Sequence, residues 1–308
     1  MKTEINKNKK QMAGDNSRRD FIKQASIGRL ALGGMMNASI EDSTISYNTQ
    51  QETKMNTLKT FKEKLLKGEP VYGPFMKTGD AAFVECAGHA GFDFCILDME
   101  HGPVDFFNLQ NLIRGAEIAE ILPIVRTYDS SDTAISKALD VGARGIQVPQ
   151  IKSAEEAREV IKAAKFFPKG ERGMCRFVRA ANYSSIPRDD YFEGANETLV
   201  ILQVEGSQVI NSLDEILAVE GLDILFVGPY DLSQSLGVPG QVSHPTVVET
   251  IKKVAERAKN AGAVIGVFCD TFEAASLWRN AGIQYLSWSV DVGIFTDACK
   301  EIVEKLKS

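Results

Sequence analysis

Short apolar runs alternate with amphipathic stretches from Met55 to the end of the chain. Apolar runs of this length are typical of strands buried on both faces of a parallel sheet, whereas apolar residues three and four apart predict helices. Several of the helical stretches close on glycine, as helix C-termini often do. The pattern predicts eight strands, over residues 71–76, 94–100, 122–128, 145–151, 200–205, 223–229, 263–269 and 285–291.

These eight strands, each followed by a helical stretch, come after one leading helix over Leu58–Leu66. Eight such units predict an α/β fold of the (β/α)₈ TIM barrel type, over residues 55–308. The alternative is an open doubly wound sheet, which usually has fewer strands and often carries a glycine-rich phosphate loop. No such loop follows any strand here. The interval 152–199 is too long for a simple connector, which indicates a functional loop.

Residues 1–54 differ from the rest, being polar and rich in Asn, Lys and Ser. They contain the stretch Ser17-Arg-Arg-Asp-Phe-Ile-Lys23, followed by a weakly apolar segment that Arg29 interrupts. Paired arginines, an aromatic residue and a lysine in this order predict a disordered twin-arginine leader and export to the periplasm. The alternative is a disordered tail of a cytoplasmic protein, in which the arginine pair is accidental.

Composition and charge exclude two classes of function. The chain is 44% hydrophobic and 25% charged, which is ordinary for a soluble enzyme. Its net charge of −6, with no run of Lys or Arg, argues against nucleic-acid binding. No apolar stretch is as long as a membrane-spanning helix, so no membrane span is predicted.

Polar side chains gather where the predicted strands end. In a barrel of this kind, the chemistry takes place at the C-terminal ends of the strands. The run FCILDMEH, for example, begins with the apolar residues of a predicted buried strand and ends in charged side chains. The candidate residues at these ends are Asp98, Glu100, His101, Arg126, Gln203, Glu205 and Asp231.

Glu205 and Asp231 follow adjacent strands, so both carboxylates can point at one place in the barrel mouth. Two carboxylates without thiolates or clustered imidazoles suit a hard divalent cation such as Mg²⁺ or Mn²⁺, completed by water and substrate oxygens. The alternative is a pair of helix N-caps or rim salt bridges. Together, the two residues favour a metal site.

His101 and Arg126 add a proton carrier and a fixed positive charge at the same end of the barrel. A carboxylate beside His101 can fix its tautomer and raise its basicity. Arg126 suits a developing oxyanion or a substrate carboxylate, although an arginine that only bridges rim acids is the alternative. With a metal, this set favours enolate chemistry on a 2-oxo acid. No lysine ends a predicted strand, which argues against a Schiff-base aldolase.

Several longer stretches recur in order in one known family, and the similarity covers essentially Leu58 to the C-terminus. They are GFDFCILDMEHGPVD, the VR of IVRT, ALDVGARGIQVPQIKSAEEAREVIKAAKFFPKGERG, LQVEG and VEGLDILFVGPYDLSQSLG with the HP after it. These stretches resemble the metal-dependent 4-hydroxy-2-oxoheptanedioate aldolases, which are pyruvate-type class II aldolases in the superfamily of the citrate lyase β subunit. The resemblance is far more specific than any single motif.

The resemblance implies a barrel of the phosphoenolpyruvate/pyruvate type. It also implies a carbon–carbon lyase that reversibly cleaves a 4-hydroxy-2-oxo acid to pyruvate and an aldehyde through a metal-bound enolate. The cation is Mg²⁺ or Mn²⁺, with Co²⁺ as an option, and the assembly is a homo-oligomer, a hexamer or trimer of dimers, often with the last helix exchanged. The implied roles are metal ligation by Glu205 and Asp231, proton transfer by His101, orientation of His101 by Asp98, enolate stabilisation by Arg126, and substrate contacts from Gln203, Phe75, Gly228 and Pro229.

The chain departs from the family pattern after GERG, where it reads MCRFVRAANYS. Arg176 and Arg179 add positive charge there, and we expect Arg176 to contact substrate and change the aldehyde preference. Two other functions stay open from the sequence. One is a citrate-lyase-like enzyme that acts on a thioester or another acceptor. The other is an exported binding protein that captures a 2-oxo acid or sugar acid without turnover.

Overall fold

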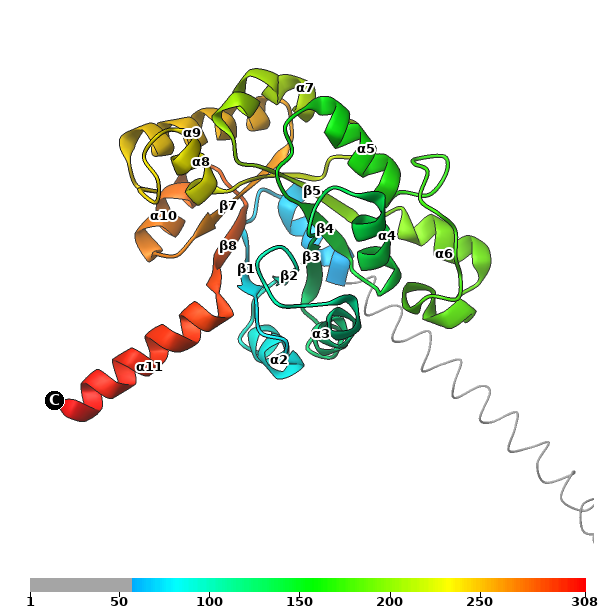
Figure 1. The fold of residues 1–308 in the computed structure, drawn as a ribbon, viewed down its shortest axis with the longest axis horizontal. Helices are drawn as coiled ribbons and strands as arrows, with labels where there is room; N and C mark the ends of the chain where they lie inside the picture. The colour runs from blue at the N-terminus through cyan, green and yellow to red at the C-terminus, as the bar shows by residue number, and fades with distance from the viewer. Residues whose placement is uncertain (1–56) are drawn as a thin grey trace, which may run out of the picture. The chain divides into compact units, whose positions relative to one another are not determined.

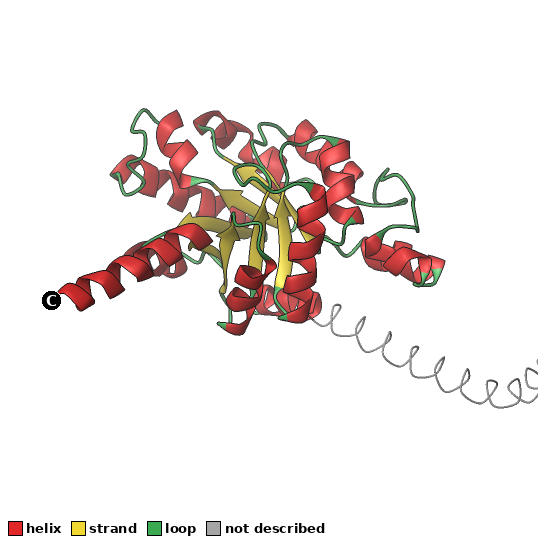
Figure 2. Cartoon of the chain, turned by 60° about the horizontal axis from the view of Figure 1, so that its bottom comes forward, coloured by secondary structure: helices red, strands yellow, loops and turns green. Residues whose placement is uncertain are grey.

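A computed structural model describes residues 57–308, so the Ser17–Lys23 stretch lies outside the described residues. A helix over residues 57–66 leads into a closed barrel of eight parallel strands, in which each strand pairs with the next and β8 pairs with β1. Figures 1 and 2 show the strands enclosed by helices. The strands are β1 (Val71–Met76), β2 (Phe94–Asp98), β3 (Leu122–Arg126), β4 (Gly145–Val148), β5 (Leu199–Val204), β6 (Ile224–Val227), β7 (Val264–Cys269) and β8 (Tyr285–Val290).

This barrel confirms the predicted fold class and all eight predicted strands. Most of the predicted runs extend past the C-terminal end of the observed strand, because their last residues are polar and leave the sheet. The helices are α2 (Ala81–His89), α3 (Phe106–Ile118), α4 (Asp132–Asp140), α5 (Ala154–Ala164), α6 (Arg188–Ala195), α7 (Leu213–Leu217), α8 (Pro229–Ser235), α9 (Pro245–Asn260), α10 (Phe272–Asn280) and α11 (Asp291–Lys307), with 3₁₀ turns η1 (Arg179–Ser184) and η2 (Ser207–Ser212).

Short polar side chains start many of these helices. Asp105, Ser131, Ser153 and Thr271 each stand just before a helix and accept a hydrogen bond from a backbone N–H of its first turn. This satisfies donors that have no partner inside the helix. The caps therefore fix where each chain segment turns back from the mouth of the barrel to the outside.

The interior of the barrel is packed with aromatic and aliphatic side chains. The rings of Phe94 and Tyr285 stack with centroids 4.2 Å apart. Phe61, from the leading helix, packs edge-on against both rings, at 5.8 and 6.4 Å. The leading helix therefore closes the N-terminal end of the barrel. The opposite end, where the strands lead into α2 to α11, is left for a site.

The part of the predicted 152–199 interval that comes after α5 lies at the closed end of the barrel. It follows α5, and a helix of a (β/α) unit returns the chain to the N-terminal ends of the strands. There Arg172 pairs with Asp140, the last residue of α4, at 2.7 Å. Arg179 pairs with Glu117, near the end of α3. The segment therefore packs against helix C-termini, away from the mouth.

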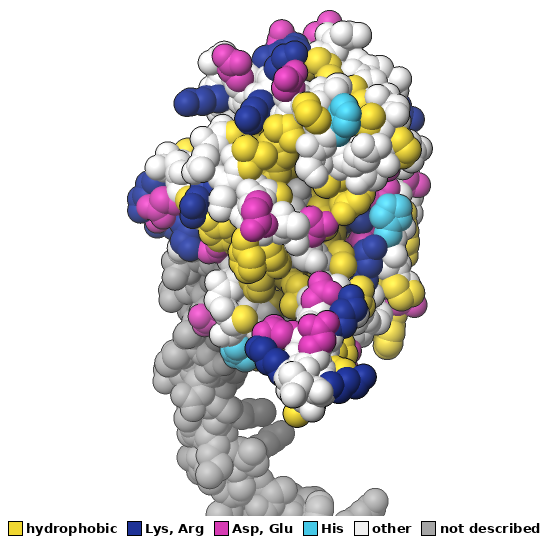
Figure 3. Space-filling model, turned by 90° about the vertical axis from the view of Figure 1, so that its left-hand side faces the viewer, with side chains coloured by type: hydrophobic (Ala, Val, Ile, Leu, Met, Phe, Trp, Pro, Cys, Tyr) yellow, Lys and Arg dark blue, Asp and Glu magenta, His cyan; other side chains and the backbone are white. Residues whose placement is uncertain are grey.

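Helix α11 extends away from the barrel, as Figure 1 shows. Six apolar side chains along it are exposed to solvent: Val292, Ile294, Phe295, Ile302, Val303 and Leu306. Figure 3 shows the side of the molecule that carries this helix, where exposed apolar side chains lie among charged ones. Among residues 57–308, no helix combines the length and the apolar character needed to cross a membrane.

Candidate active site

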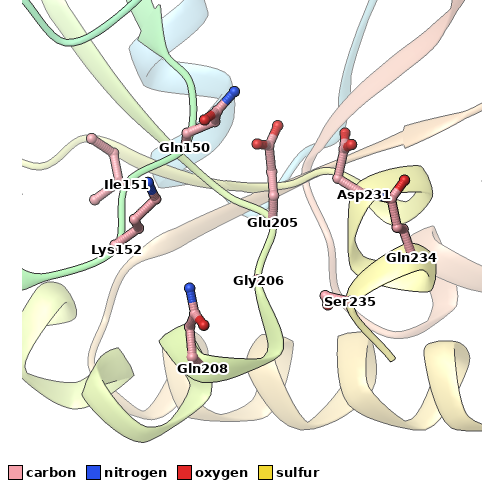
Figure 4. A pocket seen from close by; sticks show the side chains of 9 residues that line it. All are labelled: Gln150, Ile151, Lys152, Glu205, Gly206, Gln208, Asp231, Gln234 and Ser235. Atoms are coloured by element: carbon pink, nitrogen blue, oxygen red, sulfur yellow. The ribbon is translucent and has the colours of Figure 1, made fainter. Parts of the chain in front are cut away.

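Glu205 and Asp231 line one pocket at the C-terminal end of the barrel. Glu205 directly follows β5, and Asp231 lies in the first turn of α8, just after β6. Figure 4 shows the two carboxylates in the same pocket, whose volume is about 410 Å³. The other lining residues are Gln150, Ile151, Lys152, Gly206, Gln208, Gln234 and Ser235.

The turn between β6 and α8 brings Asp231 close to Glu205. A Cβ atom on Gly228 would lie 3.3 Å from Glu205 Cγ and 3.4 Å from Glu205 Oε1, so only glycine fits there without crowding the carboxylate. Pro229 occupies the first position of α8, where its fixed φ suits a helix and its missing N–H leaves no donor unpaired. Gly228 therefore leaves room for the Glu205 side chain, and Pro229 starts the helix that carries Asp231.

The two carboxylates have the chemistry of a site for a hard cation. Neither forms an ion pair with a Lys or Arg among residues 57–308. Burial, with the charges of Asp231 and Glu100 adding to it, raises the pKa of Glu205 to about 7. The part of the chain that the structure describes holds no group of three His, Cys, Asp or Glu side chains placed to bind a metal. Two carboxylates with water and substrate oxygens suit Mg²⁺ or Mn²⁺, which need few protein ligands.

Asp98 and Arg126 form a buried pair beside this pocket. Arg126 Nε donates to Asp98 Oδ1 at 2.9 Å, and Arg126 Nη2 donates to Asp98 Oδ2 at 2.7 Å. Arg126 Nη1 lies 3.0 Å from Glu100 Oε2, and the guanidinium carbon is 4.6 Å from the centre of the Phe75 ring. Burial alone would raise the pKa of Asp98, but Arg126, the His101 backbone N–H and Lys77 outweigh it and hold that pKa below its usual value.

His101 lies at the rim of the mouth, and its side chain is 59% exposed. Its backbone N–H donates to Asp98 Oδ1 at 3.2 Å, whereas its Nε2 is 3.9 Å from Glu100 Oε2. We expected the Asp98 carboxylate to orient the imidazole, and the structure differs on this point. Because Asp98 and Arg126 are paired residues of β2 and β3, the carboxylate faces the guanidinium, and Glu100 is the acidic neighbour of the ring.

The structure brings the remaining candidates to this mouth, with one exception. Gln203 is buried, and its amide nitrogen donates to Glu205 Oε1. Arg176 is the exception, because it lies in the segment at the closed end of the barrel, and its contact with substrate stays a prediction. Its Nη2 donates to the carbonyl oxygens of Ser184 and Ile186, both at 3.0 Å, so it holds together the segment at the closed end of the barrel.

Some polar residues that line the pocket are not among the candidates predicted from the sequence. Gln150 and Lys152 come directly after β4, where the rule for strand ends already predicts functional residues. Gln150 also donates to Glu100 Oε1 at 3.4 Å. Gln208 and Gln234 carried no such signal, since they lie in short helical segments after the strands.

Comparison with known proteins agrees with this geometry. A model of the HpcH/HpaI aldolase/citrate lyase family matches residues 72–298. The chain belongs to this family. It is therefore a carbon–carbon lyase of the class II pyruvate aldolase type. The chemistry of this family depends on a divalent metal.

Three similar proteins illustrate the match. A hydroxypyruvate/pyruvate aldolase of Roseobacter denitrificans is 35% identical over 254 residues, which cover 81% of this chain and 98% of that protein. A 2-keto-3-deoxy-L-rhamnonate aldolase of Escherichia coli O157:H7 is 34% identical over 258 residues, covering 82% and 96%. The crystal structure of a family member from Burkholderia cenocepacia superposes with a TM-score of 0.77 at 33% identity, covering 81% and 99%.

Proposed function

We propose that the protein reversibly cleaves a 4-hydroxy-2-oxo acid to pyruvate and an aldehyde, with a divalent cation held by Glu205 and Asp231. The observation that carries the proposal is the pocket itself. Two carboxylates that form no ion pair with a Lys or Arg of the described residues 57–308 face it, next to an arginine that a buried aspartate holds in place. The names of the two aldolase relatives support the same reaction class.

When bound, the cation would act as a Lewis acid toward the 2-oxo group of the substrate. Arg126 would stabilise the negative charge that develops as the enolate of pyruvate forms. An arginine has five N–H donors; Asp98 takes two of those of Arg126 and Glu100 Oε2 lies 3.0 Å from Nη1, so the remaining N–H groups are left for a substrate oxygen. The Asp98 carboxylate keeps the guanidinium in one orientation, which avoids reorganisation during the reaction.

His101 is the candidate for proton transfer at the 4-hydroxyl group. Its ring is exposed at the mouth, where an arriving or departing aldehyde would pass. Glu100 Oε2 lies 3.9 Å from the ring Nε2, so an acidic side chain stands next to the imidazole. Gln203 and Phe75 would contact the 2-oxo acid deeper in the barrel, beside Glu205 and Arg126.

A substrate screen tests the proposal. Purified protein, stripped with a chelator and reloaded with Mg²⁺, Mn²⁺ or Co²⁺, is assayed for pyruvate release from a panel of 4-hydroxy-2-oxo acids. We expect release with at least one metal and none in excess chelator. Cleavage of thioester substrates alone would favour the citrate-lyase-like alternative, and binding without any cleavage or proton exchange would favour the binding protein.

We also propose that the protein works as a homo-oligomer, a hexamer or trimer of dimers. The exposed apolar residues of α11 support this, because one free helix seldom exposes so many apolar side chains in a monomer. Light scattering after gel filtration tests it. Phe295→Glu should lower the molar mass, whereas Lys300→Glu, on the same helix, should not.

The location of the protein rests on residues outside the structure. We propose that the Ser17–Lys23 stretch directs export through the twin-arginine route. Replacing Arg18 and Arg19 by lysine should then retain the protein in the cytoplasm as a longer precursor. Recovery of the wild-type protein from the cytoplasm alone, with its first 50 or so residues intact, would contradict export.

A further inference from the structure

A row of buried polar side chains runs through the interior of the barrel to Glu205. The Tyr285 hydroxyl donates to Gln147 Oε1 at 3.4 Å. The Gln147 amide nitrogen donates to Gln203 Oε1 at 2.5 Å, and the Gln203 amide nitrogen donates to Glu205 Oε1. Tyr285 and Gln147 have no exposed surface, and Gln203 is 2% exposed. Water therefore does not compete for the hydrogen bonds that join Tyr285, Gln147 and Gln203, whereas Glu205, at the end of the row, is half-buried and lines the pocket.

Strand register explains how the two amides meet. Gln147 on β4 pairs with Ile201 on β5, and Gln203 lies two residues further along β5. Side chains two residues apart on a strand point to the same face, so Ile201 and Gln203 occupy successive levels of the interior. The amide of Gln147 thus reaches up by one level toward the mouth. Its register partner on β5, Ile201, is apolar, whereas its register partner on β3 is Arg126.

The direction of the row matters, because an amide group has a donor end and an acceptor end. Gln147 donates to the oxygen of Gln203, so the NH₂ group of Gln203 must face Glu205. In the flipped orientation, the Gln203 oxygen would meet the Glu205 carboxylate, and two acceptors would face each other. Gln147 therefore selects the orientation of Gln203 that binds Glu205.

We infer that Gln147 is a positioning residue for the metal site, acting through Gln203. With Glu205 Oε1 held by the Gln203 amide, Glu205 Oε2 is left for the cation. The inference rests on the proposed function, since it assigns Glu205 to a metal. It adds a residue in the interior of the barrel that is not among the residues lining the pocket.

Binding of Mn²⁺, measured by calorimetry on the full chain, tests this role. Gln147→Met keeps the length of the side chain and removes its donor. Partners that orient a metal ligand are typically worth about 10–100-fold in affinity, so we expect Gln203→Met to weaken Mn²⁺ binding by that factor. Gln147→Met should weaken it in the same direction, by a smaller factor.

The double variant separates positioning from general damage. If Gln147 acts only through Gln203, then adding Gln147→Met to Gln203→Met should not weaken Mn²⁺ binding further. Ile201→Val is the matched control, because it removes one buried methyl group beside Gln147 and leaves the polar row intact. It should lower the melting temperature and leave Mn²⁺ affinity unchanged. Gln147→Leu repeats the measurement should Gln147→Met not fold.

Two outcomes would overturn the inference. One is Mn²⁺ affinity in Gln147→Met equal to that of the wild type while Gln203→Met binds weakly. The other is additive losses in the double variant. Failure of the proposed function looks different, because the wild-type protein itself would then bind no Mn²⁺, and Glu205→Ala would change nothing.

Discussion

Asp98 and Arg126 lie opposite each other on β2 and β3 and are joined by two hydrogen bonds, 2.9 and 2.7 Å long. The Asp98 side chain has no exposed surface, and that of Arg126 is 9% exposed. A charge pair in this setting holds its geometry, because neither group can turn to water without losing its partner. The arginine is thus fixed before any substrate arrives.

The first prediction concerns the stability that depends on this pair. Asp98→Ala leaves the guanidinium buried with Glu100 as its remaining acidic partner, and breaking a buried pair typically costs about 3–5 kcal/mol. We expect a loss of that size in the free energy of unfolding, measured with urea. The exposed pair of Arg188 and Asp189 is the control, and Asp189→Ala should cause no measurable loss.

The second prediction concerns proton transfer at the rim. Removing a positioned acid or base typically slows a reaction by about 10²–10⁴-fold, so His101→Ala should lower the turnover number by that factor. Mn²⁺ affinity should stay as in the wild type, because the ring is not among the residues that line the metal pocket. His244→Ala serves as the control, since His244 only caps α9. Unchanged turnover in His101→Ala would remove this residue from the mechanism.

The third prediction concerns the choice of aldehyde. Among the residues that line the pocket, Lys152 alone carries a positive charge, and the amides of Gln208 and Gln234 line other sides of the same pocket. We expect these groups to favour an aldehyde with a carboxylate or hydroxyl groups at its far end. Lys152→Met should therefore raise KM for such an aldehyde by roughly tenfold in the condensation direction, as for loss of one charged hydrogen bond.

Two comparisons check the assignment of Lys152. Exchange of pyruvate methyl protons, which needs no aldehyde, should stay at the wild-type rate in Lys152→Met. Lys169→Met, at the closed end of the barrel, should alter neither reaction. An equal rise in KM for a neutral, unsubstituted aldehyde would show that Lys152 does not recognise the charge of the aldehyde.

The fourth prediction concerns pH. Burial raises the pKa of Glu205 to about 7, so in the metal-free protein this carboxyl is largely protonated below that pH. A cation must displace the proton, and the affinity for Mn²⁺ should rise by up to tenfold per pH unit up to about pH 7, then level off. Titrations between about pH 5 and pH 9 measure this. An affinity independent of pH over this range would contradict a direct role of Glu205.

Much of the fold followed from the sequence, because each strand is a continuous apolar run and each helix carries an amphipathic pattern. The first strand, Val71–Met76, has the predicted limits at both ends. The strands that end in Asp98 and Arg126 are shorter than predicted, since the apolar pattern does not tell where the last strand hydrogen bond forms. That depends on the neighbouring strand.

The site was harder to predict. The sequence indicated which residues belong to it, but not which side chains contact each other. Position in the sequence placed Glu205 and Asp231 at adjacent strand ends, and the structure puts them in one pocket. The sequence did not show that Asp98 faces Arg126 instead of the His101 ring, because the register of β2 and β3 sets that contact. Gln147 was hidden in an apolar run, where only the three-dimensional path of the interior reveals its partner.

The most direct test of the account is the metal dependence of pyruvate proton exchange, followed by NMR in D₂O. The wild-type protein should exchange the methyl protons with Mn²⁺ or Mg²⁺ and stop in excess chelator. Glu205→Ala and Asp231→Ala should stay folded, bind Mn²⁺ weakly and lose exchange, whereas Asp189→Ala should behave as the wild type. Exchange at the wild-type rate in excess chelator, or in both carboxylate variants, would contradict the metal site and with it the proposed mechanism.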